Sequence, residues 1–419
     1  MSDTKTSYIG HIRLVLMLLY MTHQLIPFMF YRFPAVLFAL VVFLLLLGIG
    51  QKIGRTIFAI FPIFVIEIAH IIIDIIVSDT FSVVSAMNIY VLFQNMVWAM
   101  MGIYIVRFND TKTARILFIY YFIIIFINSI TTYWGNLEYP NASRILAMGD
   151  AKDNPLFYAF HDANIGGFSF IYQIVLFEIL IIQLIKYRNR LCFPQGSLYV
   201  FIVLLIAMAC TVFVAEYTTA LLMFLGAIGL YFVPKTTKIV HLLIFGCIVF
   251  VFYETLKLPM ADFFSYLGNN IDSEIMSDRF LDMSASMKGQ AVEDESDLEL
   301  RKEAFSKSLN SFSNFIFGNW GTSREHIGWH SYIFDNMAYG GIFSIPFFVI
   351  VLSTIYKTYI QPFKGITDVI YVEFSLLFAI IMAIVNPMFY VSFLCFVVPI
   401  FLVLLTYNTK NKHESTLDN

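Results

Sequence analysis

The side chains whose chemistry stands out lie in a polar segment in the second half of the chain. Segment 257–331 carries Arg279, Arg301 and Arg324, and His330 lies at its end. A guanidinium group presents a rigid fork of N–H donors that suits the oxygens of a phosphate. An imidazole titrates near neutral pH and can exchange protons with a substrate. Together, these side chains could bind a phosphorylated substrate and assist a proton transfer.

The composition indicates the environment in which these residues must be held. Of the 419 residues, 59% are hydrophobic and 13% are charged, whereas about a quarter of the residues in a soluble domain are charged. The mean hydropathy is +0.78. These values exclude a water-soluble globule and predict a polytopic membrane protein. The net charge of −3 provides no basic surface, so nucleic acid is excluded as a partner.

Apolar segments recur along the whole chain, and they predict an all-α integral membrane protein with about 12 transmembrane helices. The predicted spans are Ile12–Phe30, Pro34–Ile49, Thr56–Val77, Val83–Val106, Ala114–Tyr133, Ile165–Ile185, Leu198–Ala215, Thr219–Val233, Ile239–Leu256, Ile333–Tyr356, Val369–Val385 and Ser392–Leu405. The first is expected to be retained, because no small-residue cleavage pattern follows it.

The charges in the loops predict the topology. Lysine and arginine concentrate in short loops that share one side if the N- and C-termini are cytoplasmic. The chain is then a single membrane domain, 1–419, with two larger outer loops at 134–164 and 257–331. Three of the four cysteines, Cys210, Cys247 and Cys395, lie in apolar runs, so we expect no disulfide framework.

The large outer loop contains one pattern of near-helical spacing. Its apolar residues are Leu298, Phe305, Leu309, Phe312 and Ile316. This spacing predicts an amphipathic helix near 298–316 that lies against the membrane surface, with Arg301 in its first turn. Two glycines, Gly318 and Gly321, then allow a tight turn before the chain reaches the next span.

Two stretches of the chain resemble a known family. Arg279, Arg301, the run Phe-Gly-Asn-Trp-Gly at 317–321 and the run from His330 to Gly341 are similar to the signature of bacterial O-antigen polymerases and the related O-antigen ligases. The run Asp-Ala-Asn-Ile-Gly-Gly at 162–167 resembles another element of that family. Ser331 and Tyr339 depart from the ligase pattern. The run 216–219 departs from the family pattern, because it lacks an arginine often found there. These departures favour a polymerase over a ligase.

The resemblance implies an activity. The family transfers a glycan from undecaprenyl diphosphate to a sugar hydroxyl, and in polymerases the acceptor is another lipid-linked repeat unit. It implies that Arg279 and Arg301 bind the diphosphate, that Arg301 is also catalytic, and that His330 is the base. Arg144, from the other outer loop, is a third candidate for binding the diphosphate. Preorganised cations would stabilise the charge that grows on the leaving diphosphate.

The resemblance also implies a location and partners. The protein is expected in the bacterial cytoplasmic (inner) membrane, with its active site facing the periplasm. Its expected partners are undecaprenyl-diphosphate-linked oligosaccharides, the lipid bilayer and a chain-length regulator. We expect no cofactor. His326 and His330 are four residues apart, but a third ligand is absent, so we predict a metal-independent enzyme.

Other interpretations remain open at this point. An arginine at a membrane surface commonly contacts lipid headgroups, and a histidine at a span boundary is commonly an ordinary interfacial residue. A ligase that uses a lipid A core acceptor is the nearest alternative. A lipid-linked oligosaccharide flippase is another, because Glu67, His70 and Asp74 lie on one face of the third span and could couple ions. In a structural or regulatory membrane protein, the outer arginines would be individually replaceable.

Overall fold

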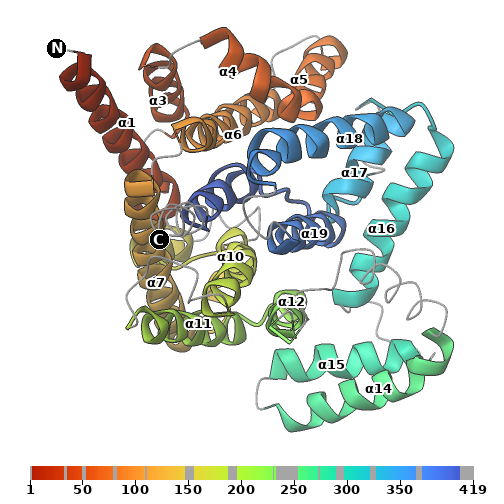
Figure 1. Cartoon of the computed structure of the whole chain (residues 1–419). Coiled ribbons are helices and arrows are strands. Elements are labelled where there is room, and N and C mark those ends of the chain that lie inside the picture. The colour runs from red at the N-terminus through yellow and green to blue at the C-terminus, as the bar shows by residue number, and fades with distance from the viewer. Residues whose placement is uncertain are drawn as a thin grey trace. The chain divides into compact units, whose positions relative to one another are not determined.

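Helices make up all the regular structure of the residues that the structure describes. The computed structural model (Figure 1) describes residues 2–32, 35–49, 53–78, 83–108, 111–146, 155–186, 196–229, 231–232, 253–271, 274–288, 297–320, 327–364 and 370–405. No strand occurs within these ranges. The predicted all-α class is confirmed for this part of the chain.

The helices have the following bounds. In the first half they are α1 (Ser2–Leu25), α2 (Pro27–Arg32), α3 (Ala35–Ile49), α4 (Ile53–Ile60), η1 (Phe61–Phe64), α5 (Val65–Ser78), α6 (Val83–Phe108), α7 (Thr111–Glu138), α8 (Ala142–Ile145), α9 (Pro155–Asp162), α10 (Phe168–Lys186) and α11 (Ser197–Val214). In the second half they are α12 (Thr218–Gly229), α14 (Tyr253–Asn270), α15 (Glu274–Lys288), α16 (Asp297–Asn314), α17 (Tyr332–Gly340), η5 (Gly341–Phe343), α18 (Ser344–Ile355), η6 (Tyr356–Ile360), η7 (Gln361–Phe363), α19 (Ile370–Val385) and η8 (Phe393–Val397).

Five helical stretches of the described chain are long and apolar enough to cross a membrane. They are Gly54–Ile73, Thr111–Glu138, Phe168–Lys186, Ser197–Val214 and Tyr332–Phe363. Shorter apolar helices are Leu37–Gly48, Val91–Arg107, Thr218–Gly229, Phe374–Val385 and Phe393–Leu405. These helices have the length and composition of an integral membrane protein, and the full number of spans stays a prediction.

Two of the predicted spans need comment. The first was expected over Ile12–Phe30, but α1 ends at Leu25 and a second helix begins at Pro27. Proline cannot donate a backbone hydrogen bond inside a helix but fits the first helical position, so it begins a new helix there. Most of the ninth predicted span, Ile239–Leu256, lies outside the described residues, and α14 begins at Tyr253.

The chain forms two compact units. Unit 1 is Met1–Ala215, Ser344–Ala379 and Tyr390–Asn419, and unit 2 is Glu216–Phe343 and Ile380–Phe389. Both units contain apolar helices. The predicted arrangement of one membrane domain, 1–419, with outer loops at 134–164 and 257–331 stays a prediction.

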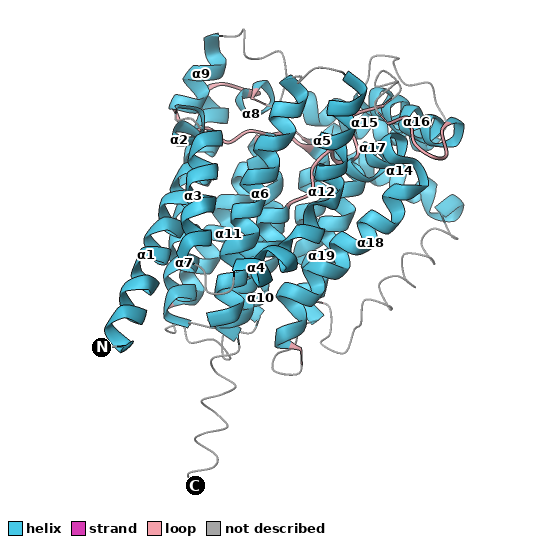
Figure 2. Ribbon diagram, turned by 90° about the horizontal axis from the view of Figure 1, so that it is seen from above, coloured by secondary structure: helices cyan, strands magenta, loops and turns pink. Residues whose placement is uncertain are grey.

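Unit 1 is a bundle of helices, and α10 lies deep within it. In Figure 2, α3, α6, α7 and α11 run in similar directions. In an 18-residue stretch of α10, 78% of the residues are buried, against 28% for α11. The helices approach most closely where α6 meets η8. An ideal Cβ on Gly102 would lie 1.6 Å from the backbone oxygen of Cys395, so glycine allows this approach.

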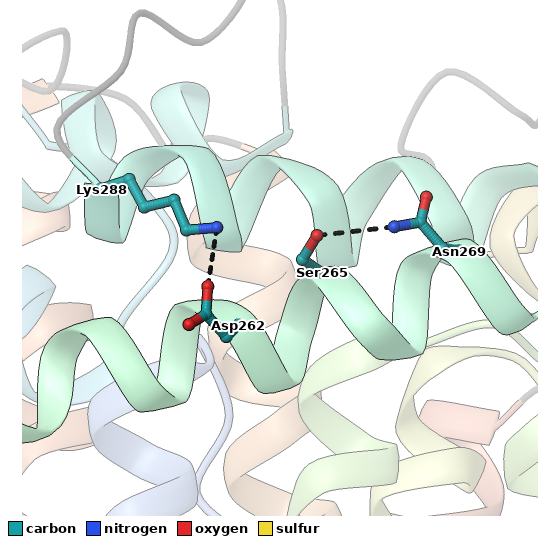
Figure 3. Close-up of polar contacts among 4 residues, drawn as sticks. All are labelled: Asp262, Ser265, Asn269 and Lys288. Carbon is teal, nitrogen blue, oxygen red and sulfur yellow. Dashed lines mark hydrogen bonds and ion pairs between the residues drawn. The ribbon is translucent and has the colours of Figure 1, made fainter.

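In unit 2, α14 and α15 form a helical hairpin. The rings of Phe264 and Phe280 stack with centroids 5.9 Å apart, and Met276 is buried beside them. Figure 3 shows polar contacts of the hairpin, where the Lys288 ammonium lies 2.9 Å from a carboxylate oxygen of Asp262. This ion pair is partly exposed to solvent and adds little stability. The apolar contacts therefore hold the hairpin together.

Helix α16 lies where an amphipathic helix was predicted, but its buried face differs from the expected apolar stripe. Ala304, Ser308 and Ser311 are buried, whereas the side chain of Leu309 is 42% exposed. The reason is close packing against the segment before α17, where an ideal Cβ on Gly328 would lie 2.0 Å from the backbone oxygen of Ala304. Contact of the remaining apolar side chains with the membrane stays a prediction.

We expect Gly102→Ala to destabilise unit 1. The added methyl group would meet the backbone of η8, so the free energy of unfolding should fall by about 1–3 kcal/mol. The matched control is Gly10→Ala on α1, where an ideal Cβ has no neighbour within 4 Å and alanine favours the helix. Thermal unfolding of the purified protein in detergent measures both variants. Equal unfolding temperatures for the two would contradict the close approach.

Candidate functional site

A cavity of about 110 Å³ lies in unit 2 at the start of α12. It combines two guanidinium groups, one carboxylate, two threonines and two apolar side chains. The lining residues are Thr218, Thr219, Leu222, Arg279, Asp282, Met283 and Arg301. Two of the sequence-predicted residues, Arg279 and Arg301, therefore share one cavity.

Arg279 holds the turn from which α12 begins. Glu216 has a left-handed backbone conformation with φ of 57°, which is unusual for a residue other than glycine. The Arg279 Nη1 donates a 2.7 Å hydrogen bond to the backbone oxygen of Glu216. A residue in this conformation persists only where its surroundings fix it. Arg279 thus couples α15 to the start of α12.

Arg301 reaches the same helix start from α16. Its Nη1 lies 3.4 Å from the hydroxyl oxygen of Thr219 and donates to it. The first N–H groups of a helix have no partner within the helix, and they give its N-terminus a partial positive charge. Two guanidinium groups and the N-terminus of α12 therefore meet in one place. This arrangement attracts an anion such as a phosphate.

Two apolar side chains also line the cavity. They are Leu222 and Met283, and both pack against the buried cluster of Phe264, Met276 and Phe280. The cavity thus combines cationic and apolar side chains. This combination suits a ligand with an anionic group attached to an apolar chain.

His330, the expected base, does not line this cavity. It lies on the segment between α16 and α17 and is exposed. The negative charge of Asp335, on α17, interacts with it. The catalytic role of His330 stays a prediction.

Buried polar groups form hydrogen bonds that fix the segment around His330. Asp335 accepts hydrogen bonds from the Ser308 hydroxyl at 2.6 Å and from the backbone N–H of Ser331 at 2.9 Å. The Ser308 oxygen in turn accepts the backbone N–H of Gly328 at 2.9 Å. One buried carboxylate on α17 therefore fixes the backbone on both sides of the exposed histidine.

Gly318, in the family-like run 317–321, is in close contact with Gly341, at the end of the family-like run 330–341. Gly318 and Gly341 both have positive φ, and an ideal Cβ on Gly341 would lie 2.2 Å from the backbone nitrogen of Gly318. The backbone N–H of Ile342 donates to the oxygen of Ile316 at 2.8 Å, and that of Trp320 donates to Tyr339 at 2.9 Å. Both glycines are therefore required by the close packing of the two runs.

Arg144, the third predicted diphosphate ligand, belongs to unit 1. It lies on the short helix α8 and is partly exposed. The adjacent Ser143 is buried and donates to the oxygen of Gly166 at 2.7 Å, while its backbone N–H donates to Asn136 at 3.1 Å. Helix α8 is thus fixed between α7 and the start of α10. The binding role of Arg144 stays a prediction.

The family-like run at 162–167 also has a structural role in unit 1. Asn164 has a left-handed conformation with φ of 58°. Its Nδ2 donates to Asn128 at 2.7 Å, and the backbone N–H of Gly166 donates to Thr132 at 2.8 Å. Both partners lie on α7, one helical turn apart. The run therefore ties the start of α10 to one polar face of α7.

No site for a metal ion is formed by the residues that the structure describes, since no group of three or more His, Cys, Asp or Glu side chains comes together there. His326 and Glu325 lie outside those residues, as does the side chain of Asp74. Glu67 and His70 lie on α5, partly buried.

Comparisons of the chain with models of protein families, with curated proteins and with solved structures find no match. The resemblance to O-antigen polymerases therefore rests on the motifs themselves.

Five residues of the cavity were not predicted from the sequence: Thr218, Thr219, Leu222, Asp282 and Met283. The threonines were noted only as a departure from the family pattern. Asp282 lies one helical turn beyond Arg279, so the spacing placed both residues on one face of a helix. This spacing could have predicted from the sequence that Asp282 lies beside Arg279.

Outside the membrane-length segments, one histidine makes stability depend on pH. Burial lowers the pKa of His161 to about 4, although the nearby Asp162 carboxylate opposes this shift. The folded protein therefore keeps the imidazole neutral below its ordinary pKa, whereas the unfolded chain takes up a proton. Stability is fully present above about pH 6.5 and falls as the pH approaches 4.

We expect the free energy of unfolding to decrease by about 2 kcal/mol between pH 7.5 and pH 5 through this residue. His161→Phe should remove that part of the pH dependence, because Phe keeps the ring packed against Phe157. His11→Phe, on an exposed position of α1, is the control and should leave the dependence intact. Unfolding midpoints in detergent at the two pH values measure the effect. An unchanged pH dependence in His161→Phe would contradict this assignment.

Proposed function

We propose that this protein is a glycosyltransferase that polymerises undecaprenyl-diphosphate-linked oligosaccharide repeat units. It would build O-antigen or a similar surface polysaccharide at the periplasmic face of the bacterial cytoplasmic membrane. The observation that carries the proposal is the cavity in which Arg279 and Arg301 meet at the N-terminus of α12. Those two arginines are among the residues that carry the family resemblance.

The cavity supplies what such a reaction requires. Negative charge grows on the diphosphate as its bond to the sugar breaks, and fixed cations lower the barrier because they need no reorganisation. Arg279 and Arg301 are held in place by hydrogen bonds to Glu216 and Thr219. The apolar side chains of Leu222 and Met283 would receive the first part of the lipid chain. The proposal needs no metal ion, since two guanidinium groups would neutralise the diphosphate.

The proposed function also includes a membrane topology and partners. The membrane would be crossed by about 12 helices with both termini in the cytoplasm. The lipid-linked repeat units would be both donor and acceptor, and a separate chain-length regulator would act with the protein.

The test of the activity is deletion of the gene followed by gel analysis of the surface polysaccharide. We expect a single repeat unit on the core in place of long polymer. Uncapped core with accumulated lipid-linked polymer would indicate a ligase instead. Accumulation of single units on the inner leaflet would indicate a flippase, and an unchanged pattern would exclude all three.

We expect Arg301→Lys to reduce polymer formation at least about tenfold, because it keeps the charge and loses the paired donors. Binding of undecaprenyl diphosphate to the purified protein should weaken by a similar factor, or about 1.4 kcal/mol. Lys307→Gln is the control, since it removes an exposed charge of the same helix outside the cavity. Full activity and binding in Arg301→Lys would show that charge alone suffices there. Equal defects in both variants would contradict a specific site.

A further inference from the structure

The cavity contains one group that a site for an anion does not need. Asp282 lies on α15, three residues after Arg279, and lines the same cavity as Arg301. It is partly buried. A carboxylate that lines the same cavity repels a bound diphosphate, and the repulsion is strong where solvent is partly excluded. Asp282 therefore does not favour binding of the anion, and the transfer reaction suggests another role for it.

The transfer reaction requires a group that accepts a proton, and the arginines and threonines of the cavity do not provide one. A diphosphate leaves with its electron pair and needs no proton, whereas the attacking hydroxyl must lose one. Guanidinium groups stay protonated, and threonine hydroxyls do not accept a proton at neutral pH. Among the residues that line the cavity, Asp282 is thus the side chain that can accept it.

We propose that Asp282 is the proton acceptor for the incoming sugar hydroxyl, an inference that rests on the function proposed above. The hydroxyl oxygen forms a bond to the anomeric carbon of the donor, and the bond from that carbon to the diphosphate oxygen breaks. The proton of the hydroxyl passes to a carboxylate oxygen of Asp282. The electron pair of the broken bond stays on the diphosphate, beside Arg279 and Arg301.

The sequence suggested His330 as the proton acceptor, but the surroundings of His330 differ from those of Asp282. It is exposed, it does not line the cavity, and Asp335 is a charged neighbour. Asp282 and Arg279 instead come from adjacent turns of one helix. The carboxylate, and not the imidazole, therefore lines the cavity in which the diphosphate would bind.

A purely structural role for Asp282 and a role as proton acceptor predict opposite changes in the affinity for the diphosphate. If the carboxylate only orients the arginines, its replacement should weaken binding of the diphosphate. If it accepts the proton, Asp282→Asn should keep the shape, remove the repulsion, and leave binding equal or tighter. The two roles thus differ in the sign of the change in affinity.

The experiment uses the full-length protein in two assays. Binding of undecaprenyl diphosphate is measured on purified protein, and polymer formation is measured in the deletion strain complemented by each variant. Asp282→Asn should reduce polymer at least about 100-fold while binding stays equal or becomes tighter. Asp282→Glu should recover part of the polymer. Asp278→Asn is the matched control, because it removes an exposed carboxylate from the same helix outside the cavity, and it should match the wild type in both assays.

Several results would overturn the proposal. Normal polymer in Asp282→Asn would remove the carboxylate from the reaction. Weaker binding together with lost polymer would assign it to orienting the arginines. Lost polymer with intact binding in His330→Asn, beside normal polymer in Asp282→Asn, would assign the base to the imidazole. If the wild type itself does not bind the diphosphate lipid, the proposed function fails, and this result is distinct from the others.

Discussion

The hydrogen bond from the Arg279 guanidinium to the backbone oxygen of Glu216 is the contact on which the candidate site depends. It stabilises a left-handed residue between the end of α11 and the start of α12. Because α12 starts from that turn, its first residues, Thr218 and Thr219, line the same cavity as Arg279. Arg301 then completes the site from α16 through Thr219. A single side chain thus has two roles: it shapes the backbone and supplies a charge.

Close backbone contacts make the rest of unit 2 rigid around this site. Gly318 and Gly341 bring the end of α16 against the end of α17, in a geometry that a Cβ at either position would prevent. Asp335 adds a buried carboxylate that accepts hydrogen bonds from Ser308 and Ser331. Burying a charge is costly unless it is hydrogen-bonded. These contacts together hold α16, and with it Arg301, in one position.

In unit 1, hydrogen bonds between neutral polar groups fix the positions of neighbouring helices. Asn128, Thr132 and Asn136 lie on one face of α7 and bind the segments that contain α8 and the start of α10. In an apolar environment, unpaired polar groups are expensive, so paired ones fix the register of neighbouring helices. Asn164 and Gly166 of the run at 162–167 therefore have a packing role in unit 1.

Local sequence patterns predict the helical class, the apolar segments and two arginines, Arg279 and Arg301, that line the cavity. Hydropathy and helical spacing are local properties, and backbone hydrogen bonds must be satisfied within each segment of a membrane protein. The spacing also predicted a helix where α16 lies, though not that small side chains such as Ala304 and Ser308 would be its buried face. Only the tertiary structure decided that Asp282 lines the cavity and that His330 does not. Those positions depend on how α12, α15 and α16 pack, and packing is set by contacts between residues far apart in the chain, which no local pattern specifies.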